Sequence, residues 1–102
     1  MSVPCTSLEE VRQHIDEIDL RLVALLAQRG SFVMQAARFK KTTGEVHAPD
    51  RVEQVVRKVR AMASETGASA EVVEQVYRAM ISAFIAEELV IHAKLANERA
   101  TS

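Results

Sequence analysis

The chain has 102 residues, of which 48% are hydrophobic and only 4% aromatic, and its formal net charge is −1 at pH 7. This length fits one domain, residues 1–102, with an aliphatic core, and the near-neutral charge argues against a basic nucleic-acid-binding domain. The first residues lack the basic and apolar regions of a signal peptide, and no apolar run approaches the ~18 residues of a membrane span, so we expect a cytoplasmic protein.

A long N-terminal helix is expected from about Ser7 to Lys40. Ser7 and Glu10 fit a capping box, and apolar residues then recur at alternating steps of three and four. About 33 residues at a rise of ~1.5 Å give roughly 50 Å, too long for a compact globule with a radius of gyration of ~13 Å. We therefore expect an intertwined homodimer in which two long helices share a core. The alternative is a kink at Gly30 that folds the helix back.

Two further helices are expected after a loop at residues 42–48. Pro49 and Asp50 suit the first turn of the second helix, and Gly67 ends it. Ser69 is expected to cap the third helix, whose apolar residues cover a broad arc. The predicted fold class is therefore all-α, a three-helix protomer with a long N-terminal helix.

Charged residues at core-facing positions give the main functional signal. Arg29 and Lys40 are eleven residues apart, which places them ~16 Å apart along the helix and within about 20° of one stripe. Glu88 lies within an apolar face of the third helix, where a carboxyl group must be paired, hydrogen-bonded or protonated. An Arg29–Glu88 ion pair without chemistry is one explanation. The functional alternative is a cation-lined pocket, which suits a compact ligand with several carboxylates.

This candidate pocket combines residues from both ends of the first helix. One straight helix holds Arg12 ~25 Å from Arg29, so we expect Arg12 to come from the partner chain. Arg29, Lys40 and Arg51 complete the lining, with Glu88 as a polar tip. The sequence contains no nucleophile–base arrangement, no phosphate-binding loop, and no cysteine–histidine cluster with metal-ligand spacing. An enzyme of this kind would act by binding, orientation and electrostatics, without a metal or other cofactor.

Basic residues are concentrated where the first helix ends and the second begins. Arg38 and Lys41 are expected to be solvated charges, because cations suit the C-terminal end of a helix dipole. The loop at residues 42–48, between Lys40 and Arg51, joins two expected ligand-binding ends and contains a glycine. It is therefore a candidate lid.

The pattern resembles the all-helical (type II) chorismate mutases over roughly residues 8–95. The resemblance rests on the runs EEVRQHIDEIDLRLVALLAQR, AARFKK, APDRV and FIAEEL, which contain Arg12, Arg29, Lys40, Arg51 and Glu88. It implies an intertwined homodimer and a small dicarboxylate substrate, chorismate, with no nucleic-acid or membrane partner. It also implies that Arg12 from the partner chain and Arg29 from the same chain hold the two carboxylates. Lys40 and Glu88 would donate to the ether oxygen, and Arg51 would line the site.

The implied reaction is the Claisen rearrangement of chorismate to prephenate. The enzyme would hold the substrate in a compact conformer, and hydrogen-bond donors would stabilise the negative charge that grows on the ether oxygen as the C–O bond breaks. Lys40 can donate at neutral pH, whereas Glu88 can donate only when it is protonated. We expect Glu88 to act as a neutral donor, so that activity falls as pH rises.

Two positions instead resemble the isochorismate pyruvate-lyase branch of this family, which gives salicylate and pyruvate. Val52 stands where mutases commonly carry a glutamate that holds the substrate hydroxyl, and Phe84 stands where many carry a small hydroxyl residue. That branch carries glutamine rather than glutamate at the position of Glu88. The sequence therefore keeps both reactions open and favours the mutase, the commoner activity of the fold. A third interpretation is a helical dimerisation module without catalysis.

Overall fold

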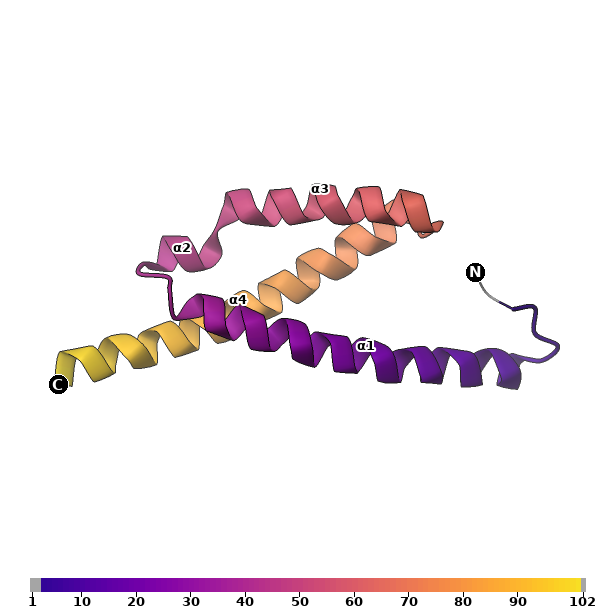
Figure 1. The fold of residues 1–102 in the computed structure, drawn as a ribbon, viewed down its shortest axis with the longest axis horizontal. Coiled ribbons are helices and arrows are strands. Elements are labelled where there is room, and N and C mark those ends of the chain that lie inside the picture. The colour runs from indigo at the N-terminus through magenta and orange to yellow at the C-terminus, as the bar shows by residue number, and fades with distance from the viewer. Residues whose placement is uncertain (1–2, 102) are drawn as a thin grey trace. The chain divides into compact units, whose positions relative to one another are not determined.

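The computed structural model describes residues 3–101, and the regular secondary structure in this range is entirely helical. Four helices follow one another along the chain (Figure 1): α1 (Leu8–Ala37), α2 (Thr43–His47), α3 (Pro49–Thr66) and α4 (Ala70–Thr101). The predicted all-α class and the long N-terminal helix are confirmed. Helix α1 continues through Gly30, so the helix break considered there does not occur. Among the described residues, no helix has the length and apolar character needed to cross a membrane.

The chain divides into two compact units, Met1–Phe32 and Val33–Ser102. The first unit contains most of α1. Ser7 caps the start of this helix, as the sequence predicted. The Ser7 Oγ accepts a hydrogen bond from the Glu10 backbone N–H at 3.1 Å. The Glu10 carboxylate reaches one residue further back than a capping box predicts, because it accepts from the Thr6 backbone N–H at 3.1 Å and the Thr6 hydroxyl at 3.0 Å. These two bonds, the backbone one first, hold the pKa of Glu10 below its usual value.

The apolar stripe of α1 is exposed in this chain. Leu22 is 51% exposed, Leu25 58% and Leu26 42%. Burying one leucine side chain stabilises a fold by about 1.5–3 kcal/mol relative to leaving it in water. In residues 3–32 of the first unit, α1 is the one helix, so these described residues offer no second helix against which to bury the stripe.

Residues 42–48, which were predicted to form a loop, lie in the second unit and are partly helical. This segment contains the short helix α2, which Thr42 caps by accepting a hydrogen bond from the Glu45 backbone N–H at 3.1 Å. The Glu45 carboxylate in turn accepts from the Lys41 backbone N–H. Val46 is only 1% exposed, and α2 packs against α4. Ala48 ends α2 in the left-handed region, with φ of 39°, and passes the chain directly to α3.

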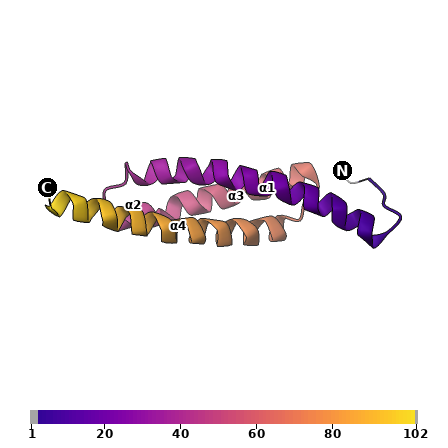
Figure 2. The same ribbon diagram turned by 90° about the horizontal axis from the view of Figure 1, so that it is seen from below.

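Helix α3 starts and ends where the sequence predicts. Pro49 and Asp50 occupy its first turn, and Gly67 ends it with a φ of 81°, in the left-handed region that glycine adopts at low cost. The Ser69 Oγ then accepts a hydrogen bond from the Val72 backbone N–H at 3.3 Å and caps α4. Figures 1 and 2 show that α4 runs back along α3 from this connection, and the two helices pack together. Buried small apolar residues of α3 form much of the core, namely Val56, Val59 and Ala63.

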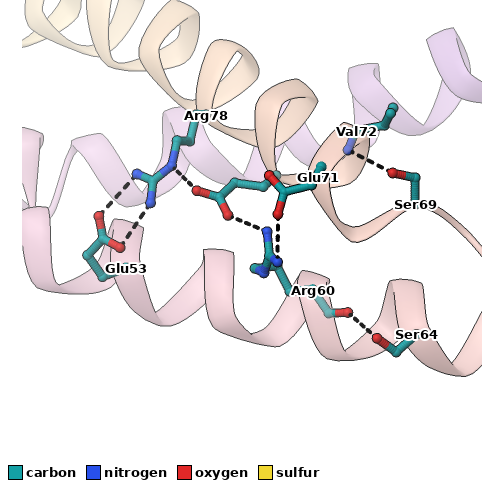
Figure 3. Close-up of polar contacts among 8 residues, drawn as sticks. Glu53, Arg60, Ser64, Ser69, Glu71, Val72 and Arg78 are labelled. Carbon is teal, nitrogen blue, oxygen red and sulfur yellow. Dashed lines mark hydrogen bonds and ion pairs between the residues drawn. The ribbon is translucent and has the colours of Figure 1, made fainter.

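An ion-pair network also joins α3 to α4 (Figure 3). Arg78 of α4 donates to both carboxylate oxygens of Glu53 on α3 at 3.0 Å, and its Nε donates to Glu74 at 2.8 Å. Arg60 of α3 donates to Glu74 at 2.6 Å and to Glu71 at 2.9 Å. The arginines lower the pKa of both Glu53 and Glu74, and for each carboxyl the hydrogen bond from Arg78 is the largest cause. The hydrogen bonds that Arg78 donates to Glu53 and Glu74 raise the pKa of Arg78.

Candidate functional site

A direct contact between Lys40 and Glu88 forms the centre of the candidate site. The Lys40 Nζ donates to the Glu88 Oε2 at 2.8 Å. The Glu88 side chain is 5% exposed and that of Lys40 is 25% exposed, so the pair is largely removed from solvent. Hydrogen bonds between ionised partners are shorter and stronger than neutral ones. An ammonium group has three donors, so a ligand could still receive hydrogen bonds from Lys40 while this contact persists.

Lys40 reaches this position because α1 ends three residues earlier than the sequence predicts. Helix α1 ends at Ala37, and the Lys40 backbone N–H donates to the Ala37 carbonyl at 3.2 Å in a tightened final turn. Ala37 is fully buried, whereas Arg38 and Lys41 are exposed. The predicted contrast between an inward Lys40 and solvated Arg38 and Lys41 is therefore confirmed.

The structure also answers how a carboxyl group can lie on the apolar face of α4. Among the described residues, Glu88 is the charged residue that is buried, with 4% of its surface exposed. It is paired, which is one of the three states that its sequence position allowed. The partner that the structure gives it is Lys40, whereas the ion pair considered from the sequence was with Arg29. Buried carboxylates need such a partner because desolvation without one is costly.

Arg51 is oriented along its own helix. Its Nη1 donates to the Gln54 Oε1 at 2.7 Å, and its side chain is exposed at the start of α3. The next residue, Val52, is half-buried, as is Phe84, which lies one turn before Glu88 on α4. The structure thus gives Arg51 a partner on α3 and does not pair it with Lys40 or Glu88.

The remaining predicted site residues, Arg12 and Arg29, belong to the first compact unit. Arg12 is exposed and Arg29 is half-buried. The second unit brings together Lys40 and Glu88, the two residues that the family resemblance assigns to the ether oxygen. The residues assigned to the substrate carboxylates lie on α1 before the boundary between the units.

A second group of polar side chains lies at the start of α1, where the sequence indicated none. One ligand atom each from Cys5, Glu10 and His14 lies within 4.8 Å of the others. The sequence shows no cysteine–histidine cluster with metal-ligand spacing, and the structure adds this group, which that spacing did not indicate. Sequence spacing missed the cluster because Cys5 precedes the helix, although the four-residue step from Glu10 to His14 could have indicated a shared face.

Comparisons with known proteins identify the family to which the chain is similar. The family described as chorismate mutase type II matches residues 11–89, a range that contains all five predicted site residues. The chain is 36% identical over 85 residues to an isochorismate pyruvate lyase of Pseudomonas aeruginosa, covering 83% of this chain and 84% of that protein. It is 27% identical over 75 residues to a chorismate mutase of Methanocaldococcus jannaschii, covering 72% and 76%.

A third relative is a longer protein. The chain is 31% identical over 83 residues to the T-protein of Haemophilus influenzae, covering 80% of this chain but only 22% of that protein. The family match and the lyase relative each cover most of the chain. The chain therefore belongs to the chorismate mutase type II family of enzymes.

Proposed function

We propose that this enzyme catalyses a pericyclic reaction of an enolpyruvyl ether that carries two carboxylates, and that the reaction is the release of pyruvate from isochorismate to give salicylate. The Lys40–Glu88 contact carries the first part of the proposal, because it holds an ammonium group on a nearly buried carboxylate at 2.8 Å. Held in this way, Lys40 is an oriented donor for an oxygen on which negative charge develops.

Lys40 is suited to the step that the two candidate reactions share, the breaking of a C–O bond at the ether oxygen. In the lyase reaction a ring hydrogen moves to the enolpyruvyl methylene carbon while the ring C–O bond breaks. The ether oxygen becomes the carbonyl oxygen of pyruvate, and the ring becomes aromatic. Negative charge grows on that oxygen during the step, and a fixed ammonium donor stabilises it more in the transition state than in the ground state.

The role of Glu88 depends on whether it carries a proton. Its contact with the Lys40 ammonium is the arrangement expected of a carboxylate in the ligand-free enzyme. As a carboxylate, Glu88 would orient Lys40 and would not itself donate to the substrate. For Glu88 to be a second donor, Lys40 must turn to the substrate and Glu88 must take up a proton. We retain this neutral-donor role as a proposal with a pH-dependent test.

We propose that Arg12 from a partner chain, together with Arg29 and Arg51, holds the substrate carboxylates. The exposed leucines of α1 support a homodimer, because a second copy would remove this stripe from water. In such a dimer Arg12 would enter the site from the other chain, so that one helix need not orient both of its ends toward one small ligand. Arg51 would have to exchange its bond with Gln54 for one with the substrate.

Two observations favour the lyase over the mutase. Val52 follows Arg51, and valine has no group that could hold the ring hydroxyl, which a glutamate commonly holds in mutases. The lyase relative also matches at 36% identity over most of both chains. Glu88 favours the second candidate, chorismate mutase, because the resemblance implies glutamine in the lyase branch.

Parallel assays of the purified protein test the proposal. Loss of chorismate is followed by absorbance, and pyruvate release from isochorismate is followed with a coupled dehydrogenase. We expect kcat/KM for isochorismate to exceed kcat/KM for chorismate by about tenfold or more. The opposite ratio would assign the mutase. Absence of both activities in a folded protein would leave the non-catalytic helical module.

A further inference from the structure

We propose that Cys5, Glu10 and His14 form a binding site for one zinc-like divalent ion at the start of α1. Their ligand atoms lie within 4.8 Å of one another, and thiolate, carboxylate and imidazole are the groups that bind Zn²⁺ in proteins. Ligands at ~2.0–2.3 Å from a tetrahedral zinc ion are about 3.3–3.8 Å apart. Side-chain shifts on the order of 1 Å, without movement of the helix, would therefore close the site.

The backbone around Cys5 is held against the first turns of α1. The neighbouring Thr6 donates to the Glu10 carboxylate through both its backbone N–H and its hydroxyl. This pair of bonds fixes the segment before the helix, although Cys5 itself is outside α1. Glu10 and His14 are four residues apart and lie on one face of the helix. The Thr6 bonds use Oε2 of Glu10, and a carboxylate has a second oxygen for a metal ion.

His14 lies near a second carboxylate, although beyond hydrogen-bond distance. Its Nδ1 lies 4.0 Å from the Glu17 Oε2, one turn further along α1. Histidine ligands commonly direct their second ring nitrogen at a carboxylate, which fixes the ring orientation. If the Glu17 carboxylate moved closer and accepted from Nδ1, Nε2 of His14 would bind the metal ion.

The chemistry of the three ligands selects the class of metal. A thiolate ligand favours Zn²⁺ over Mg²⁺ or Ca²⁺, which prefer oxygen. On binding, the Cys5 thiol would lose its proton to solvent and give up its hydrogen bond to the Val3 carbonyl, now at 3.4 Å. Three protein ligands leave a fourth position for water. The positive end of the helix dipole opposes a cation here, so we expect low-micromolar rather than structural-site affinity.

The proposed metal site is separate from the proposed substrate site. Arg12 is two residues from both Glu10 and His14, which places it about 160° away from each around the helix. Metal binding and turnover can therefore be measured independently, and loss of one does not imply loss of the other.

The test uses the full chain after treatment with a chelator and dialysis. Calorimetric titration with Zn²⁺ should give one ion per chain, whereas Mg²⁺ should give no heat of binding. Co²⁺ should give an absorption band from thiolate-to-cobalt charge transfer, and Cys5→Ser should remove it. Cys5 precedes α1, so this substitution leaves the helix intact, as circular dichroism can verify.

Variants at each position distinguish binding by these three specific ligands from nonspecific attraction of a cation to a negatively charged surface. Cys5→Ser, Glu10→Gln and His14→Gln should each weaken Zn²⁺ binding by about 10- to 100-fold. Glu9→Gln removes an exposed carboxylate from the same turn, and His47→Gln removes an exposed imidazole from α2; both should bind like the parent. The proposal is overturned if Cys5→Ser keeps full affinity, if the stoichiometry is not one, or if the two control variants lose as much affinity as the others.

Discussion

Lys40 and Glu88 are 48 residues apart in the sequence, yet the ammonium of one donates to the carboxylate of the other at 2.8 Å. One residue follows the end of α1 and the other lies within α4. Their contact ties the segment that leads into α2 to the helix against which α2 packs. The two residues therefore have a structural role as well as the proposed catalytic one, and experiments must separate the two roles.

Lys40→Ala should abolish most of the turnover and also destabilise the fold. Loss of the ammonium donor should reduce kcat by about 10²–10³-fold. The substitution also leaves the nearly buried Glu88 without its partner, which should cost about 1–3 kcal/mol of unfolding free energy. Steady-state kinetics and urea denaturation measure the two effects. Lys41→Ala, which removes an exposed neighbouring charge, is the matched control and should change neither.

The double variant Lys40→Ala/Glu88→Ala separates the roles further. Removing both partners avoids the unpaired carboxylate, so stability should partly return while activity does not. Recovery of activity together with stability would show that Lys40 is not a donor to the substrate.

Glu88→Gln tests the neutral-donor proposal. If a protonated Glu88 donates to the ether oxygen, activity of the parent enzyme should fall as pH rises, because the acid loses its proton. Glutamine donates at every pH, so the variant should keep its activity at high pH and show a flatter kcat profile. An unchanged pH profile in Glu88→Gln would leave Glu88 only the role of orienting Lys40.

Val52→Glu should shift the reaction preference toward the mutase. The new carboxylate would stand directly after Arg51, where it could hold the ring hydroxyl of chorismate. We expect the ratio of kcat/KM for chorismate to kcat/KM for isochorismate to rise about tenfold. Val52→Gln has nearly the same size without the charge and serves as the control. An equal shift in both variants would indicate a change in pocket shape rather than a new charged contact.

The local ends of the helices could be predicted from sequence, because each depends on a few neighbouring residues. The helices begin and end where capping chemistry predicts, at Ser7, Pro49, Gly67 and Ser69. Helix α2 could not be predicted in this way, because five residues give no apolar period. Its formation depends on the Thr42 cap and on burial of its valine against α4, a contact between segments distant in sequence.

In the candidate site, too, the sequence predicted some features, whereas others depend on contacts between segments distant in sequence. The sequence predicted an inward Lys40, but helical phase is not the reason for its position, because Lys40 follows the end of α1. The apolar surroundings of Glu88 favoured a partner, and the structure gives it one. Phase could not choose between Lys40 and Arg29 as that partner, because the choice depends on how the chain turns after Ala37. The Cys5 cluster was missed for a similar reason, since it depends on hydrogen bonds from Thr6 rather than on spacing alone.

Leu25→Asp should convert the proposed dimer to a monomer. Leu25 lies on the exposed apolar stripe of α1, and a charge buried there in a shared core would lack a partner. Light scattering coupled to size-exclusion chromatography should give the dimer mass for the parent and the monomer mass for this variant. Leu20, which is 76% exposed, lies on the opposite side of the helix, so Leu20→Asp should remain dimeric. A monomeric parent at micromolar concentration would contradict the dimer.

The ion-pair network between α3 and α4 should make stability depend on pH in the acid range. Glu53 and Glu74 have folded-state pKa values below their usual value, chiefly through hydrogen bonds from Arg78. Their unfolded-state pKa is about 4.3, so their stabilising contribution is fully present above that pH. It is lost as pH falls through the lower folded-state values, because protonation breaks the pairs with Arg78 and Arg60.

Glu74→Gln isolates this contribution, because Glu74 accepts from both arginines and is the least exposed carboxylate of the network. The variant should melt at a lower temperature than the parent at pH 7, and the gap should narrow as pH falls below about 4. Added salt should narrow the gap only in part, because the less exposed pairs are screened less. Glu65→Gln, an exposed position on α3, should melt like the parent at every pH. A constant gap between Glu74→Gln and the parent across the acid range would show that the side chain acts through packing rather than through its charge.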